Sequence, residues 1–200
     1  MAETDAQPNT KKPGLHAAVL AIFVAVAVCA FLVDRVAKIL VLENLELGVP
    51  VDIIGNLLQF RYVENPGAAF SLGSGTTWIF AILASAVAVF IIIFARRIRS
   101  AGWAVMLGLL LGGNVGNLTD RLTREPSFGQ GHVVDFIQVW GFPAIFNVAD
   151  IAIVSSMGLF IILTIRGVKL DGTRESRKAD VANVPDDTDE SPAPTATERP

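Results

Sequence analysis

The sequence contains little that could build a disulfide framework, a metal site or a nucleophilic catalytic centre. Its single cysteine, Cys29, lies within an apolar run and can form neither an intrachain disulfide nor a zinc site of the cysteine type. The two histidines, His16 and His132, fall on opposite sides of the membrane in the topology derived below, and no serine has a neighbouring base. A glycine-rich phosphate loop and an internal repeat are also absent. We therefore expect no metal and no cofactor.

Charge is scarce as well. Charged residues make up only 18% of the 200 residues, and the formal net charge of −3 gives no reason to expect a nucleic-acid partner. Hydrophobic residues, by contrast, make up 52% of the chain, which is too apolar for an ordinary water-soluble domain of this size. The composition indicates one domain that is embedded in a membrane.

Four apolar stretches are long enough to cross a bilayer, whose hydrocarbon core of about 30 Å needs roughly 20 helical residues and tolerates about 17. They are residues 15–33, 78–95, 101–118 and 148–165. The first stretch is longer than the apolar core of a typical signal peptide and lacks a small-x-small cleavage site, so we expect it to be retained. The sequence thus predicts a mainly α-helical domain with four transmembrane helices over residues 15–168.

The orientation follows from lysine and arginine, which are enriched on the cytoplasmic flanks of membrane helices. With the N-terminus inside, ten of the lysines and arginines up to residue 178 lie on the cytoplasmic side and five on the outer side, and the basic turn at residues 96–99 is the clearest marker. We therefore expect both tails, residues 1–14 and 169–200, in the cytoplasm and the two long loops, residues 34–77 and 119–147, outside. The C-terminal tail is rich in proline and polar residues, so we expect it to be disordered.

The two outer loops contain short apolar runs. Residues 49–64 are rich in β-branched and aromatic side chains and are interrupted by Gly55 and Asn56, which predicts a β-hairpin. Residues 133–140 are too few to span the bilayer and should form a strand or a surface helix. We expect a small β-sheet and a short loop helix on the extracytoplasmic side.

Ionisable residues gather near the outer ends of the predicted spans. Asp34 follows the first span, Asp120 ends the third, Asp150 begins the fourth, and Asp135 lies in the loop between the last two. An ionised side chain at the membrane centre costs about 2.5–3.5 kcal/mol on insertion scales, so each such residue needs a reason. A cluster assembled from the ends of separate spans indicates a functional site.

The third span also carries amides and glycines. Asn114, Asn117 and Arg121 share one helical face because they are three and four residues apart. The glycines at positions 112, 113 and 116 permit another helix or a ligand to approach closely. Polar contacts between helices are a structural alternative for these residues.

Asp135 and Asp150 can form a pair of interacting acids. Two carboxylates brought close cannot both stay ionised, and a shared proton leaves one acid and one base to activate a water against an amide. Asp150 has a structural alternative, because Asn147 three residues earlier matches a helix N-cap. The residues alone leave Asp120 open as a member of the pair. They also leave open a proton-coupled transporter, whose site should lie nearer the midplane, or a scaffold that uses the cluster to join helices.

Five ordered blocks of sequence resemble the lipoprotein signal peptidase (signal peptidase II) family of intramembrane aspartyl endopeptidases. They cover roughly residues 31 to 155 and consist of Asp34 with Lys38, residues 64–71 (ENPGAAFS), residues 112–121 (GGNVGNLTDR), residues 133–136 (VVDF) and residues 146–150 (FNVAD). The resemblance implies that Asp135 and Asp150 are the catalytic dyad.

The resemblance assigns roles to the other members of the cluster. It implies that Asp34 and Lys38 support the site, that Asp120 pairs with Arg121 as structure, and that the dyad and the substrate are oriented by Asn65, Asn117, Arg121 and Asn147. The sheet would cradle the substrate and the short loop helix would cover the dyad.

The resemblance also implies a substrate and a location. Members of this family remove the signal peptide from diacylglyceryl-modified prolipoproteins by cutting before the lipidated cysteine. The implied partners are these precursors, membrane lipids and globomycin-type inhibitors. The site would lie near the extracytoplasmic interface of the bacterial cytoplasmic membrane.

Overall fold

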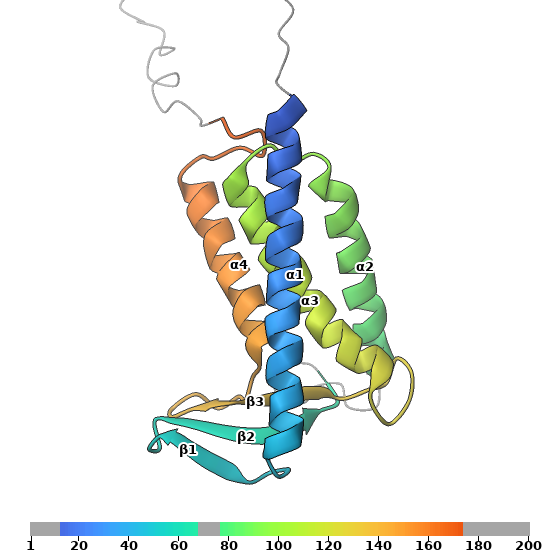
Figure 1. Cartoon of the computed structure of the whole chain (residues 1–200), viewed down its shortest axis with the longest axis vertical. Helices are drawn as coiled ribbons and strands as arrows, with labels where there is room; N and C mark the ends of the chain where they lie inside the picture. The colour runs from blue at the N-terminus through green and yellow to red at the C-terminus, as the bar shows by residue number, and fades with distance from the viewer. Residues whose placement is uncertain (1–12, 68–76, 174–200) are drawn as a thin grey trace, which may run out of the picture.

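A computed structural model describes residues 13–67 and 77–173, which form four long helices and a small sheet (Figure 1). Each helix is long and apolar enough to cross a membrane. The strands lie together at one end of the helices, and both described chain ends lie at the other (Figure 1). This confirms the predicted class of four helices with a small sheet. In chain order the elements are α1 (Pro13–Asn44), β1 (Pro50–Ile54), β2 (Leu58–Asn65), α2 (Thr77–Ala95), α3 (Ala101–Thr123), β3 (Val133–Val139) and α4 (Val148–Ile165).

The helices are exposed on faces that carry large apolar side chains, as expected for contact with lipid. Phe90 and Ile93 on α2 and Val154 on α4 are each more than 60% exposed. Hydrocarbon offers no hydrogen-bonding partners, so a spanning segment must satisfy its backbone internally, and the α-helix does this within one segment. The apolar runs therefore form helices without needing a strongly amphipathic pattern.

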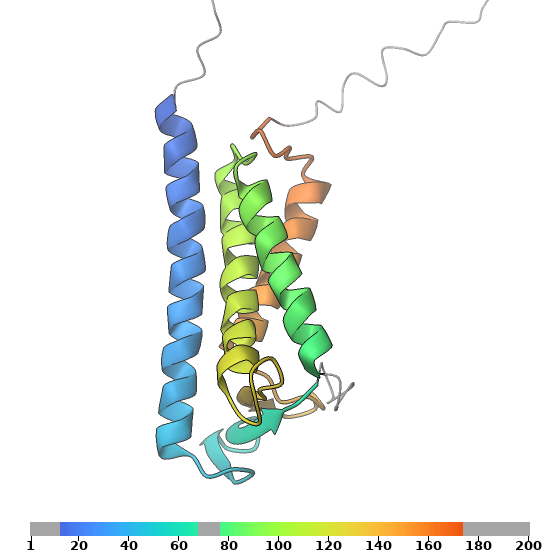
Figure 2. The same ribbon diagram turned by 90° about the vertical axis from the view of Figure 1, so that its right-hand side faces the viewer.

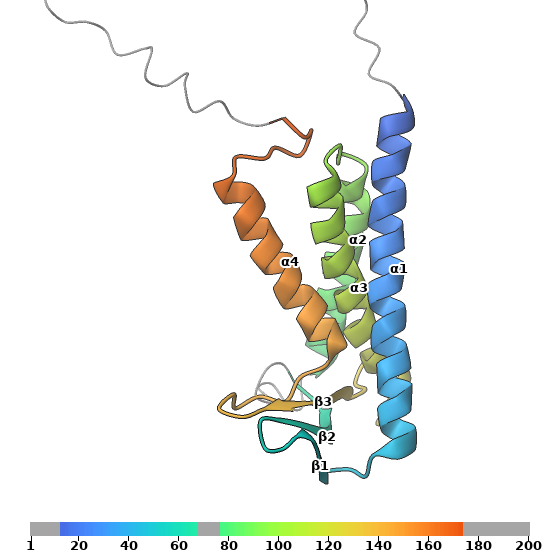
Figure 3. The same cartoon turned by 60° about the vertical axis from the view of Figure 1, so that its left-hand side comes forward.

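The central helix is α3, which packs against the three others. Figures 2 and 3 show α1 on one side of α3 and α4 on the other. Glycine makes this close packing possible: a Cβ atom at Gly112 would lie 2.5 Å from the carbonyl oxygen of Ala27 on α1, and one at Gly113 would lie 2.5 Å from that of Ala149 on α4. The predicted role of these glycines in close helix approach is confirmed.

The first helix is longer than predicted. The expected end at residue 33, before the charged Asp34, is wrong, because α1 continues to Asn44. Its 32 residues rise about 48 Å, which exceeds the bilayer core by several turns. Asp34 does not end the helix because it pairs with Lys38 one turn later at 2.9 Å, and both side chains are fully buried in the protein. The last turns of α1 thus reach the sheet.

The three strands form an antiparallel sheet in the order β1-β2-β3. The predicted hairpin is present, with Val51 opposite Phe60 and Gly55 in the left-handed conformation at its turn. One face of the sheet packs on the end of α1 through Phe60, Val134 and Phe136. The loop between α1 and α2 supplies β1 and β2, and the connection between α3 and α4 supplies β3. Together these strands form one layer at the end of the helices.

The apolar run in the second outer connection forms a strand, which is one of the two alternatives predicted for it: residues 133–139 pair with β2. Residues 124–132 and 140–147 form turns and extended segments, so the short helix expected in this loop is wrong. A short apolar run can satisfy its backbone hydrogen bonds either in a helix or beside another strand, and β2 supplies that partner here. α3 also extends five residues beyond its predicted end, to Thr123. The predicted disorder of the C-terminal tail concerns mainly residues 174–200, which lie outside the described residues.

Candidate active site

The carboxyl groups of Asp135 and Asp150 come from different elements and meet at one asparagine. Asp135 lies in β3, and Asp150 lies in the first turn of α4. The Asn147 side-chain amide donates to Asp135 Oδ1 at 2.6 Å, and its backbone N–H donates to Asp150 Oδ2 at 3.1 Å. The Asn147 side-chain oxygen in turn accepts from the Asp150 backbone N–H at 3.0 Å, which completes a capping box. The N-cap pattern is therefore present, and the same asparagine also holds both acids.

Two further asparagines each donate to one member of the pair. Asn65, at the end of β2, donates to Asp135 Oδ2 at 2.9 Å. Asn117, on α3, donates to Asp150 Oδ1 at 2.9 Å. Each carboxyl group thus receives hydrogen bonds on both oxygens, which restricts its rotation and leaves its remaining lone pairs for a ligand.

Both acids line a cavity of about 560 Å³ between the sheet and the ends of the helices. Asn65, Asn117 and Arg121 contribute polar groups to the cavity. The rest of the cavity lining is mostly apolar. It is formed by Val133, Phe142, Ala144, Ile145, Phe146, Ile151 and Val154. A cavity with a few convergent polar groups in an apolar wall is the usual form of a small-molecule or peptide site.

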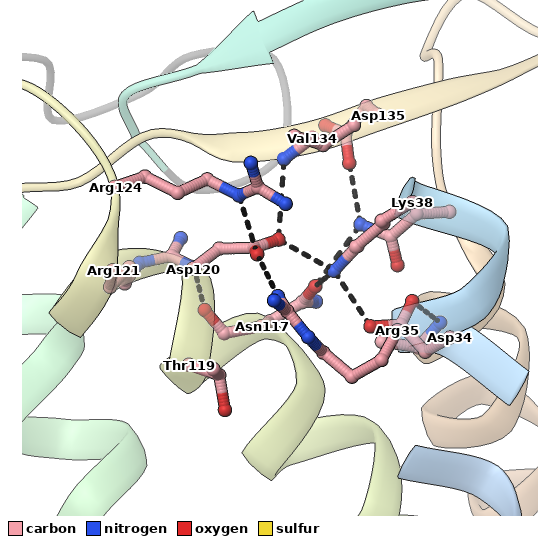
Figure 4. A network of polar contacts seen from close by, with 12 residues as sticks. Asp34, Arg35, Lys38, Asn117, Thr119, Asp120, Arg121, Arg124, Val134 and Asp135 are labelled. Carbon is pink, nitrogen blue, oxygen red and sulfur yellow. Dashed lines mark hydrogen bonds and ion pairs between the residues drawn. The ribbon is translucent and has the colours of Figure 1, made fainter. Parts of the chain in front are cut away.

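A buried lysine connects α1 to this pair (Figure 4). The Nζ atom of Lys38 lies 2.9 Å from Asp34 Oδ2, 2.8 Å from Asp120 Oδ2 and 2.9 Å from the side-chain oxygen of Asn117. Because the oxygen of Asn117 faces the ammonium group, its NH₂ group must point the other way, toward Asp150. The Asn147 side-chain amide donates to the same oxygen at 3.1 Å, so Lys38 and Asn147 together determine which way the Asn117 amide is oriented.

Asp34, which also contacts Lys38, is linked to the start of α4. Its Oδ1 atom accepts a hydrogen bond of 2.9 Å from the backbone N–H of Ala149, the residue before Asp150. Gly116 on α3 leaves room for this carboxylate, since a Cβ atom there would lie 2.6 Å from Asp34 Oδ2. The start of α4 is thus joined to α1 through one buried acid.

Asp120 is paired differently from the arrangement that the family resemblance implied. It does not pair with Arg121; it forms ion pairs with Arg35, Lys38 and Arg124 at 2.7–2.8 Å. Arg121 follows Asp120 on the helix and therefore points about 100° away from it. The fully buried Asp120 belongs to the α1–α3 contact and does not line the cavity.

Arg121 turns toward the cavity. Its Nη2 atom donates to the Gly67 carbonyl oxygen at 2.7 Å, and its guanidinium carbon lies 5.8 Å from the centre of the Phe80 ring. Its buried Nε has no hydrogen-bond partner among residues 13–67 and 77–173. A buried donor without a partner is costly, and it favours a site that receives an acceptor from a ligand.

Burial changes the acidity of Asp135. Removal from water raises its pKa to about 7, and the nearby charge of Asp150 acts in the same direction. The hydrogen bonds from Asn65 and Asn147 and the charge of Lys38 lower the pKa but do not offset the burial. Asp135 is therefore a carboxyl group that holds its proton up to neutral pH.

All eight residues predicted for the site lie in one connected region. The sequence reasoning missed two arginines, Arg35 and Arg124, which bind Asp120. The spacing of four residues between Asp120 and Arg124 on one helix could have indicated the second. Asn114 does not join the site and donates to the Ala84 carbonyl oxygen at 2.8 Å, so it joins helices.

The fold and the site together define a multi-pass membrane protein with a paired-carboxylate cavity at one end of its helices. The model of the family described as signal peptidase (SPase) II matches residues 26–166. The chain belongs to the signal peptidase II family, which is a family of peptidases.

Individual relatives support this assignment. The chain is 54% identical over 171 residues to the lipoprotein signal peptidase of Leifsonia xyli subsp. xyli, covering 86% of this chain and 78% of that protein. It is 41% identical over 165 residues to the lipoprotein signal peptidase of Mycobacterium tuberculosis, covering 82% and 80%. A solved bacterial membrane enzyme superposes with a TM-score of 0.66 at 26% identity, covering 78% of this chain and 94% of that one.

Proposed function

We propose that this protein is an aspartyl endopeptidase that removes the signal peptide from diacylglyceryl-modified prolipoproteins by cutting before the lipidated cysteine. The observation that carries the proposal is the pair Asp135 and Asp150, which line one cavity and are bridged by Asn147. Membership of the signal peptidase II family supports the substrate class, because the relatives are lipoprotein signal peptidases. Paired acids of this kind hydrolyse amides without a metal.

The proposed mechanism divides the acid and base roles between the two residues. Asp135, whose pKa is raised to about 7, carries the proton and acts as the acid, and Asp150 acts as the base. Asp150 accepts a proton from a water molecule as that water attacks the scissile carbonyl carbon. Asp135 donates its proton to the carbonyl oxygen, which gives a neutral tetrahedral intermediate. Asp150 then transfers the proton that it accepted to the leaving nitrogen as the C–N bond breaks. Asp135 takes back a proton from a hydroxyl of the intermediate, which gives the carboxylic acid product and restores both acids.

The cavity offers separate places for the backbone and the apolar parts of such a substrate. The unpartnered Nε of Arg121 is suited to a backbone carbonyl oxygen of the signal peptide. The apolar wall, which includes Phe142, Ile151 and Val154, is suited to aliphatic side chains and to an acyl chain. Asn65 and Asn117 would hold the acids in place while the substrate binds.

We further propose that both termini are cytoplasmic and that the site lies near the extracytoplasmic interface. The basic residues Arg96, Arg97 and Arg99 between α2 and α3 support this orientation, because they lie at the end of the helices away from the sheet (Figure 1). A cysteine introduced at Ser127 should react with a membrane-impermeant thiol reagent added to intact cells, whereas one at Ser100 should react only after lysis. The reverse labelling would refute the orientation.

The central test is cleavage of a diacylglyceryl-modified prolipoprotein by the purified protein in lipid. We expect one cut before the modified cysteine, at the same rate with and without EDTA, and inhibition by globomycin. Mass spectrometry of both products identifies the cut. The matched control is the same precursor without the diacylglyceryl group, which should be processed far more slowly. A folded protein that leaves the lipidated precursor intact, or cuts it elsewhere, would refute the proposed function.

Activity should fall as the pH rises through about 7. Above that pH the Asp135 carboxyl loses its proton, so no donor remains for the carbonyl oxygen. The direction of this pH dependence follows from the raised pKa of Asp135. The folded protein keeps the proton on this carboxyl group below neutral pH, so the acid is present there and is lost as the pH rises. Measured kcat/KM between pH 5 and pH 9 should show a descending alkaline limb of slope one near about pH 7. A flat profile across this range would exclude Asp135 as the acid.

A further inference from the structure

Two arginines outside the predicted site bind the same oxygen atom of Asp120. Arg35 on α1 donates from Nη1 at 2.8 Å, and Arg124 after α3 donates from Nε at 2.7 Å, both to Oδ1. Their side chains are 25% and 21% exposed, whereas Asp120 is fully buried. The two guanidinium groups therefore close over Asp120 from the surface (Figure 4).

The other oxygen of Asp120 faces the dyad. Asp120 Oδ2 lies 2.8 Å from Lys38 Nζ and accepts a hydrogen bond of 3.4 Å from the backbone N–H of Val134. Val134 precedes Asp135 in β3, and Lys38 contacts the oxygen of Asn117, whose amide donates to Asp150. The Asp120 carboxylate is thus linked to Asp135 through the backbone of β3, and to Asp150 through Lys38 and the side-chain amide of Asn117.

The formal charge of this network changes sign when the arginines are removed. Asp34 and Asp120 contribute two negative charges, and Lys38 contributes one positive charge between them. Arg35 and Arg124 bring the sum of the five groups from −1 to +1. Without the arginines, Lys38 would be the only cation beside the two buried carboxylates. These carboxylates would then offset more of the electrostatic effect of the Lys38 charge on Asp135.

We propose that Arg35 and Arg124 are positioning residues, which hold the Asp120 carboxylate so that it fixes Lys38 and the start of β3 in the geometry that the dyad needs. This inference rests on the proposed function for its catalytic consequence. The contacts that carry it are independent of the substrate. Neither arginine lines the cavity, so neither would touch the reacting atoms.

The neighbourhood of Asp135 predicts the direction of the effect. Lys38 on α1, Arg121 on α3 and Asp150 on α4 act electrostatically on Asp135. Asp34 and Asp120 act through Lys38, which both contact. Glu64 and His132 follow the strand alternation to the opposite face of β2 and β3. Loss of two positive charges makes this neighbourhood more negative. Asp135 should then hold its proton to higher pH.

The test compares the double variant Arg35→Gln/Arg124→Gln with Arg96→Gln/Arg97→Gln, which removes the same charge from exposed positions far from the site. We expect the first variant to lose about 10- to 100-fold in kcat, since misplaced catalytic groups cost rates of this order, with KM changed less than about twofold. Its alkaline limb should move up by about half a pH unit or more. Arg35→Lys/Arg124→Lys should recover most of both effects, and the control pair should resemble the parent.

Infrared titration of the Asp135 carboxyl gives a readout that does not depend on cleavage. The C=O band of the protonated acid is assigned by its loss in Asp135→Asn, and its midpoint should rise in Arg35→Gln/Arg124→Gln. If the parent does not cleave the precursor but this midpoint shifts, the proposed function fails and the positioning role stands. If a folded double variant keeps the parental midpoint and kcat, or loses activity only in proportion to its folded fraction, the positioning role is refuted.

Discussion

Asp135→Asn and Asp150→Asn are each expected to lower kcat by about 10³-fold or more, because acid–base groups in the transition state contribute about 10²- to 10⁴-fold and the pair acts as a unit. An amide at either position can neither exchange a proton with water nor donate to the substrate as an acid. The effects should not add, since one acid without the other cannot perform the reaction. Single-turnover cleavage of the lipidated precursor measures this directly.

Folding must be matched for this comparison. Each carboxyl group accepts two hydrogen bonds, so an amide NH₂ would face a donor such as Asn65 or Asn117, at a cost of about 1–3 kcal/mol. Thermal unfolding in detergent shows how much of each variant is folded, and Asp52→Asn, at an exposed position in β1, is the control. Normal turnover by a folded variant of either Asp135 or Asp150 would contradict the proposed dyad.

Lys38→Met is expected to destabilise the protein by about 3–5 kcal/mol, the usual effect of removing one partner from a buried ion pair. Methionine fills a similar volume, so the loss would be mainly electrostatic. Asp34 and Asp120 would then face each other without the ammonium group that now lies 2.9 Å and 2.8 Å from them. The free energy of unfolding, measured by denaturant titration in mixed micelles, should fall accordingly.

A compensating variant separates charge from packing in this prediction. Lys38→Met combined with Asp34→Asn removes the buried charge that the loss of Lys38 leaves without a counter-ion, and it should recover part of the lost stability. Glu43→Gln, which removes an exposed charge from the same helix, should change stability by less than about 0.5 kcal/mol. If Lys38→Met is as stable as Glu43→Gln, the buried network does not hold the helices together.

Several features of this protein depend on local sequence, and these were predictable. The four spans follow from apolar runs whose length matches the bilayer, and α4 begins and ends at the predicted residues. The hairpin follows from alternating β-branched residues around Gly55 and Asn56. The grouping of Asp135, Asp150 and their asparagines was anticipated from span ends and from the resemblance to one family.

Other features depend on contacts between distant residues, and only the tertiary structure decided them. The sequence places Asp34 at the point where an apolar run stops, yet α1 continues because Lys38 and α3 neutralise and enclose that charge. Residues 133–139 became a strand because β2 offered backbone partners.

The ion pairs of Asp120 are the clearest example of contacts that could not be predicted from the sequence. Its two arginines lie 85 residues away and 4 residues away, and only the second spacing is visible along a helix. The sequence by itself determined the four apolar helices and the chemical types in the site, because hydropathy and local backbone preference act over short stretches. The tertiary structure decided which charge pairs with which, because the energy of a buried ion pair depends on distance and on exclusion of water.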